Sequence, residues 1–141
     1  GLKGAALKQR VDQLLDQMDK VKQGLLFVNL VDFDSQFGHR RDVAGYANAL
    51  EEFDLRLSEI EAKLEPQDLV LLSADHGCDP TWPGSDHTRE HVPVVFFGHY
   101  CGAPVKAFNL GERANFADMG QTIAQHLNLV PLAYGDACTL N

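Results

Sequence analysis

The sequence predicts an α/β fold in which a layered sheet is flanked by helices. Short apolar runs have the length and composition of strands, and they alternate with segments whose apolar residues recur every three or four positions. The composition agrees, because 45% hydrophobic and 23% charged residues are ordinary values for a globular protein. A chain of 141 residues suits one domain, so we expect a single domain over residues 1–141.

Amphipathic periodicity predicts helices over residues 5–22, 43–64 and 116–127. The middle helix has the clearest pattern, with apolar residues at alternating steps of three and four. Asp42 is a suitable N-cap for it, and Pro66 prevents its continuation.

Apolar composition predicts strands over residues 25–31, 68–74 and 92–98, with a further strand near 105–108. The first run, LLFVNLV, is expected to be buried on both faces of the sheet. Polar loops follow the first two predicted strands, and α/β sheets bind ligands outside the carboxyl ends of their strands. These loops are therefore the candidate functional site.

The charge and the cysteines exclude several classes of protein. A net charge of −8 opposes binding to nucleic acid, which requires a basic face. The apolar runs fall short of the ~20 residues that span a bilayer, and the N-terminus lacks the apolar stretch of a signal peptide. Three widely spaced cysteines without a CxxC motif argue against a disulfide framework. We expect a cytoplasmic protein with neither nucleic-acid nor membrane partners.

The two loops, residues 31–42 and 75–91, combine carboxylates with imidazoles. Oxygen and nitrogen ligands without thiolates favour manganese, magnesium or zinc. The first carboxylates of each loop follow an apolar run, where an unpaired carboxylate is costly unless a cation or hydrogen bonds stabilise it. Either loop alone also fits a capping aspartate and a solvated histidine. The two loops together favour a metal site.

Three segments resemble the bacterial phosphopentomutases, a metal-dependent branch of the alkaline phosphatase superfamily. They are VDFDSQFGHRRDVAGY (31–46), SADHGCDPTWPGSDHTREHVP (73–93) and NFADMGQTIA (115–124). The resemblance covers nearly the whole chain from Gly24 onward. It implies the C-terminal portion of an alkaline-phosphatase-like core. The implied enzyme is an isomerase that interconverts ribose 1-phosphate and ribose 5-phosphate, or their deoxy forms, with two manganese ions and a phosphorylated threonine.

The resemblance also implies the ligands of both metals. Asp34, His39 and His87 match the ligands of one metal, and Asp75 and His76 match ligands of the other. Arg40, Arg41 and Arg89 are the arginines of the two loops. Each is a candidate for holding a substrate phosphate in a bidentate fork, or alternatively for pairing with a neighbouring carboxylate.

The chain departs from the family pattern in length. The family's nucleophilic threonine, a further metal-binding aspartate and the cap domain have no counterpart here, so the catalytic nucleophile is unknown. We expect an inactive fragment whose partners are a phosphorylated pentose and the missing N-terminal part of the enzyme. The alternatives are a phosphoglycerate mutase or phosphatase of the same superfamily, and a non-catalytic metal-binding module. The long match through HRRD and DPTWPGSDHTREH argues against the first two.

Overall fold

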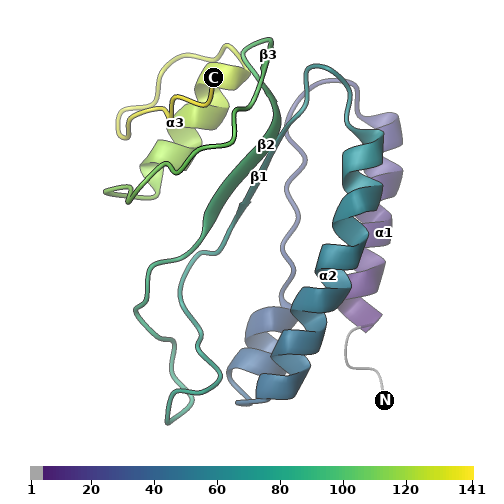
Figure 1. Cartoon of the computed structure of the whole chain (residues 1–141), viewed down its shortest axis with the longest axis vertical. Coiled ribbons are helices and arrows are strands. Elements are labelled where there is room, and N and C mark those ends of the chain that lie inside the picture. Colours follow the sequence, from purple (N-terminus) through teal and green to yellow (C-terminus); the bar gives the residue numbers. More distant parts are fainter. Residues whose placement is uncertain (1–4) are drawn as a thin grey trace. The chain divides into compact units, whose positions relative to one another are not determined.

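The computed structural model describes residues 5–141, which contain two compact units (Figure 1). The N-terminal unit runs to Lys63 and includes Ser73–Pro93, and the C-terminal unit consists of Leu64–Leu72 and Val94–Asn141. A compact unit is not by itself an independently folding domain, so the single domain stays a prediction. The α/β class is confirmed, because helices and a small sheet make up the fold.

Two long helices form the N-terminal unit. They are α1 (Ala5–Lys20) and α2 (Val43–Lys63), which end within two residues of the predicted boundaries. The helices pack against each other through a core that includes Leu7 and Ala49. An ion pair between Arg56 Nη2 and Asp12 Oδ1, 2.7 Å long, also links them.

Asp42 caps α2 as the sequence predicts. The backbone N–H of Gly45 donates a 2.9 Å hydrogen bond to Asp42 Oδ1, which satisfies one of the free donors of the first turn. A second carboxylate, that of Asp32, is almost fully buried and accepts a 3.0 Å hydrogen bond from the backbone N–H of Leu7. Asp32 therefore stabilises the start of α1, where the helix dipole favours negative charge.

The predicted strand over residues 25–31 is wrong. The segment is extended and irregular, and alternate side chains are exposed, with Phe27 86% accessible. A strand requires a neighbouring strand for its hydrogen-bond ladder. The described residues pair no strand with this segment, so its strand-forming composition is not realised.

The predicted loop over residues 31–42 is also wrong in part. Residues Phe33–Gly38 form a single π-helical segment, η1. Its i→i+5 hydrogen bonds include those from the N–H of His39 to Asp34 O and from the N–H of Asp42 to Phe37 O, both 3.0 Å. The wider turn of this helix decides how the first candidate ligands are arranged.

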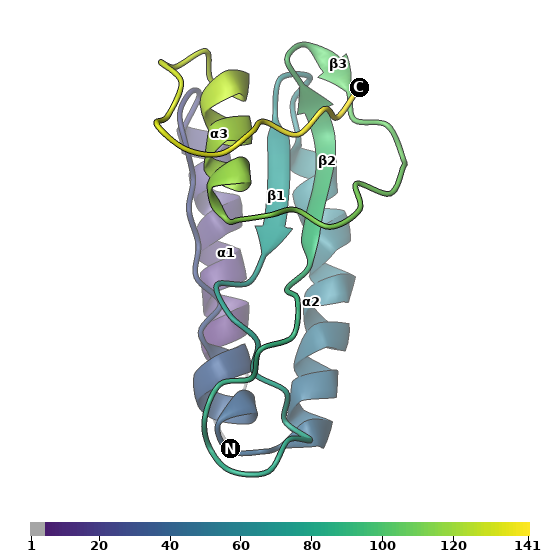
Figure 2. The same ribbon diagram turned by 90° about the vertical axis from the view of Figure 1, so that its left-hand side faces the viewer.

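The C-terminal unit contains the sheet. Its strands, in the order β1-β2-β3, are β1 (Leu69–Ser73), β2 (Val94–Tyr100) and β3 (Ala103–Pro104). β2 and β3 are antiparallel, and the arrows of β1 and β2 also run in opposite directions (Figure 2). The strands predicted over 68–74 and 92–98 are present as β1 and β2. The strand expected near 105–108 is wrong, because these residues are irregular and β3 lies just before them.

Helix α3 (Ala117–His126) holds the C-terminal tail in place. Its Asp118 accepts hydrogen bonds from Arg113 Nε and from the backbone N–H of Asp136, at 2.8 and 2.9 Å. These contacts, that of Asp136 above all, keep the pKa of Asp118 below its usual value. The tail then buries Cys138 and Leu140. Within residues 5–141, none of the helices combines the length and the apolar character needed to cross a bilayer.

Candidate metal centre

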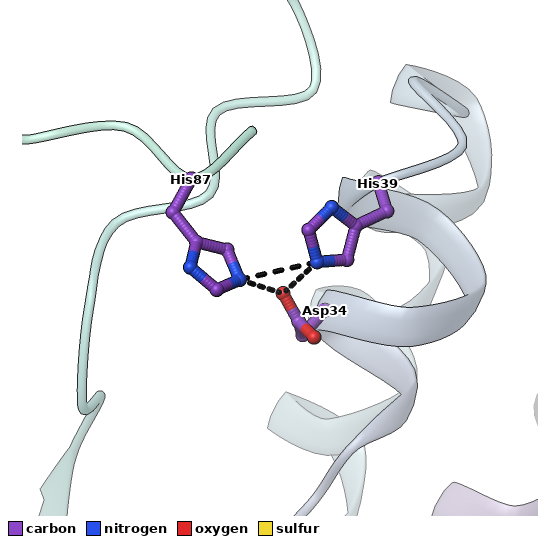
Figure 3. Close-up of side chains that lie close together, drawn as sticks. All are labelled: Asp34, His39 and His87. Carbon is purple, nitrogen blue, oxygen red and sulfur yellow. Dashed lines mark hydrogen bonds and ion pairs between the residues drawn. The ribbon is translucent and has the colours of Figure 1, made fainter. Parts of the chain in front are cut away.

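The π-helical turn brings the first two candidate ligands together. Asp34 and His39 are five residues apart, and the N–H of His39 donates to Asp34 O across one wide turn of η1. Their side chains therefore lie on the same side of this turn (Figure 3). Sequence spacing alone predicts a turn here but not its π-helical form. Such single turns are frequent at functional sites.

Gly38, at the end of η1, makes this arrangement possible. A Cβ at position 38 would lie 2.5 Å from Cys78 Sγ and 2.9 Å from Phe33 O. The second loop therefore approaches η1 more closely than any larger residue would allow. Burial and the neighbouring Asp34 carboxylate raise the pKa of the Cys78 thiol, which disfavours its thiolate form.

We predict that Gly38→Ala destabilises the chain by about 1–3 kcal/mol and weakens metal binding, because the added methyl separates η1 from the second loop. Urea unfolding and a manganese titration measure the two effects. Gly120→Ala in α3 is the matched control, since its Cβ would meet only the movable Leu132 Cδ1 at 3.2 Å. Equal stability of Gly38→Ala and the parent would contradict the prediction.

His87 arrives from the second loop and completes a group of three ligand-type side chains (Figure 3). Its Nε2 lies 3.1 Å from His39 Nε2, and both nitrogens lie 3.4 Å from Asp34 Oδ1. No other group of three His, Cys, Asp or Glu side chains converges this closely in the described part of the chain.

The triangle of ligand atoms fits a divalent cation. Ligand atoms that surround a metal at about 2.1 Å are separated by about 3.0–3.4 Å in octahedral or tetrahedral geometry. Asp34 Oδ1 is buried and has no hydrogen-bond partner. An isolated buried carboxylate oxygen is costly, and a cation between the three atoms would supply the missing interaction.

A hydrogen bond to the His39 ring determines which of its two nitrogens carries the hydrogen. Nδ1 lies 2.5 Å from the carbonyl oxygen of Ser85, which can only accept, so Nδ1 carries the hydrogen. The lone pair of Nε2 then faces Asp34 and His87. This is the tautomer that a metal-binding histidine requires, and such partners typically fix ring orientation in metal sites.

The other predicted pair lies in the same loop. Asp75 Oδ1 is 3.6 Å from His76 Nε2, and the Asp75 side chain is 84% exposed. His76 Nδ1 lies 3.1 Å from the carbonyl oxygen of Gly77, so that here too Nε2 is left with its lone pair. The ring of His76 stacks on that of His87 with centroids 3.7 Å apart, which places the two predicted sites side by side.

The three arginines differ in their surroundings. Arg40 and Arg89 are exposed. Arg41 instead directs its guanidinium at backbone carbonyls, among them those of Asp79 and Asp86, both at 2.7 Å. Phosphate binding stays a prediction, and Arg40 and Arg89 have the more accessible guanidinium groups.

Sequence reasoning missed two contributors to this centre. The carbonyl of Ser85 orients His39, and a backbone carbonyl leaves no trace in the identity of its residue. The sequence leaves Arg41 open between holding a substrate phosphate and pairing with a neighbouring carboxylate, and the structure instead directs its guanidinium at backbone carbonyls. The sequence carries no signal for these contacts of Arg41, because their acceptors are backbone carbonyl groups.

A carboxylate and two imidazoles around one point define a protein of the divalent-metal-binding class. The chain matches the Metalloenzyme superfamily over residues 3–131 and belongs to it. Membership implies that the chain binds a divalent metal.

The chain is also similar to curated proteins named phosphopentomutase. It is 59% identical to that of Legionella pneumophila (strain Paris) over 126 residues, which are 88% of this chain and 30% of the relative. It is 55% identical to that of Shewanella denitrificans over 137 residues, and 52% identical to that of Yersinia enterocolitica over 135. The last two matches cover 96% and 95% of this chain but 33% and 32% of the relatives. The chain thus spans about a third of the length of the curated relatives that it matches.

Proposed function

We propose that the chain is the C-terminal part of the catalytic core of a phosphopentomutase. The whole enzyme would interconvert (deoxy)ribose 1-phosphate and (deoxy)ribose 5-phosphate by metal-assisted phosphoryl transfer. The proposal rests on Asp34 Oδ1, which lacks a hydrogen-bond partner and lies 3.4 Å from the Nε2 atoms of both His39 and His87. The names of the relatives support the choice of reaction.

Two divalent metal ions, manganese in our proposal, would serve the reaction. Asp34, His39 and His87 would bind one, and Asp75 and His76 would contribute to the second. The free lone pair of His76 Nε2 beside Asp75 Oδ1 supports the second assignment. Two adjacent metals can stabilise both the attacking and the leaving oxygen of a phosphoryl group.

Substrate recognition would draw on the exposed guanidinium groups of Arg40 and Arg89. An acidic protein needs such local positive charge to hold a phosphorylated pentose against its net charge of −8. The same net charge supports the absence of nucleic-acid partners, and we propose a cytoplasmic location for the enzyme.

Among the described residues, the hydroxyl groups of Thr88 and Thr122 are already engaged or buried. Thr88 Oγ1 accepts a hydrogen bond from the N–H of Asp79 and donates to Glu90, and Thr122 is fully buried in the C-terminal unit. A non-catalytic metal-binding module is therefore the second candidate. The remaining part of the enzyme would supply the phosphorylated threonine.

A fusion protein tests the proposed reaction. This chain replaces the matched region of the Legionella pneumophila relative, and ribose 5-phosphate formed from ribose 1-phosphate is measured with manganese present. We expect turnover on the order of 10 per second, an ordinary enzyme rate. The same fusion with His87→Ala should be at least a hundredfold slower. Phosphate release without isomerisation would instead indicate a phosphatase and contradict the proposal.

A further inference from the structure

We propose that Arg41 is a positioning residue of the metal centre. Its guanidinium fixes the loop that carries His87 and, through the same loop, the orientation of the His39 ring. The inference rests on the proposed role of Asp34, His39 and His87 as metal ligands, and it goes beyond that role because Arg41 contacts neither metal nor substrate.

The guanidinium of Arg41 is occupied by backbone carbonyls from both loops. Nε donates to Gly84 O at 2.5 Å, and Nη2 donates to Asp86 O at 2.7 Å. Nη1 donates to Asp79 O at 2.7 Å and to Gly38 O at 3.3 Å. A planar group with five N–H donors can satisfy several converging carbonyls at once, whereas a lysine ammonium cannot reproduce this fork.

Three consecutive carbonyls of the second loop, those of residues 84–86, are held by the first loop. Arg41 binds the first and the third, and His39 Nδ1 binds the middle one, that of Ser85. His87 is the next residue along the chain. A shift of this short stretch would therefore break the hydrogen bond between His39 Nδ1 and the Ser85 carbonyl, and it would displace His87 at the same time.

The backbone of Arg41 is consistent with a fixed role. Its φ of 52° lies in the left-handed region, which residues with a side chain adopt only when the surroundings stabilise it. The N–H of Arg41 donates to Gly38 O at 3.0 Å and closes the turn between η1 and α2. Gly84, one of the acceptors, also has a left-handed backbone, with φ of 85°. Glycine adopts this conformation without strain, so the strained residue of the contact is Arg41.

The 141-residue chain with Arg41→Lys tests the inference. We expect its manganese affinity, measured by titration calorimetry, to be at least tenfold weaker than that of the parent, the usual scale for losing a group that orients metal ligands. Arg56→Lys is the matched control, because it removes a guanidinium bound to Asp12 and Glu59 in the same unit but outside the centre. Its affinity should stay within twofold of the parent.

The His39 tautomer supplies a readout that a general loss of stability would not change. In the metal-free parent, ¹H–¹⁵N spectra should show the hydrogen on Nδ1, and Arg41→Lys should show a mixture of tautomers. Arg41→Ala should recover manganese affinity with millimolar guanidinium but not with ammonium. An affinity of Arg41→Lys within twofold of the parent, with an unchanged tautomer, would overturn the inference.

The inference can still be tested if the parent does not bind manganese or if Arg41→Lys does not fold. If the parent does not bind manganese, the metal assignment fails, and the tautomer in the metal-free chain still tests Arg41. If Arg41→Lys does not fold, the Nε–H of Arg41 in the unaltered chain is measured instead. Slow exchange of this hydrogen with solvent supports the inference, and exchange as fast as that of the exposed Arg40 overturns it.

Discussion

Replacing Asp34 or His87 with alanine should weaken manganese binding at least tenfold. Each change removes one corner of the triangle formed by Asp34 Oδ1 and the two Nε2 atoms. Even residues that only orient metal ligands typically contribute this much to affinity, so direct ligands should contribute no less. Titration calorimetry of the parent and both variants gives the comparison.

Two control variants separate the first site from general effects. Arg56→Lys alters a guanidinium bound to Asp12 and Glu59, in the same unit but outside the centre, and should leave the first site intact. His126→Ala removes an imidazole from the C-terminal unit, where its Nδ1 lies 3.3 Å from the N–H of Cys101. Unchanged affinity in both Asp34→Ala and His87→Ala would contradict the assignment of the triad.

Although Asp34→Ala should weaken metal binding, it should not lower the stability of the metal-free chain. One oxygen of the Asp34 carboxylate, Oδ1, is buried without a hydrogen-bond partner, although the side chain as a whole is 38% accessible, so the lost hydration of Oδ1 weakens the fold when no cation is present. We therefore expect Asp34→Ala to be at least as resistant to urea as the parent in the presence of a chelator. With saturating manganese the parent should become the more stable of the two, because binding to the native state stabilises it. A purely structural carboxylate would give the reverse order without metal.

The helices could be predicted from the sequence because the apolar residues of their buried faces recur every three or four positions. The apolar repeat of α2 and its cap at Asp42 need no distant partner to be recognised. The segment 25–31 shows the limit of this reasoning. Its residues favour a strand, but a strand exists only through a ladder with another strand, and local composition does not contain that partner.

The candidate site was predicted in its residues but not in its geometry. The motif resemblance named Asp34, His39 and His87, and the structure brings these three side chains together. The π-helical turn that aligns the first two depends on i→i+5 hydrogen bonds, for which the sequence has no distinct pattern. Three of the carbonyls that Arg41 binds lie 38–45 residues away in the sequence, so only the fold could reveal these contacts.

We expect that the 141-residue chain alone does not interconvert ribose 1-phosphate and ribose 5-phosphate. Transfer through a covalent intermediate needs a nucleophile held in line with the phosphate. Among the described residues, the Thr88 hydroxyl beside His87 is already hydrogen-bonded to Asp79 and Glu90, and Thr122 is fully buried. The ligand side chains are also open to water, with 38% of Asp34 and 46% of His87 accessible, so solvent would screen the charges that stabilise the transition state.

A coupled assay for ribose 5-phosphate, with manganese and a sugar bisphosphate activator, measures this loss. Turnover should lie at least a thousandfold below the roughly 10 per second of an ordinary enzyme, since removal of a nucleophile commonly costs more than that. Adding the unmatched part of the Legionella pneumophila relative as a separate chain should restore part of the activity, whereas adding it to the His87→Ala chain should not. Full turnover by the isolated chain would mean that it carries its own nucleophile, and the proposed division of the active site between two parts of the enzyme would then be wrong.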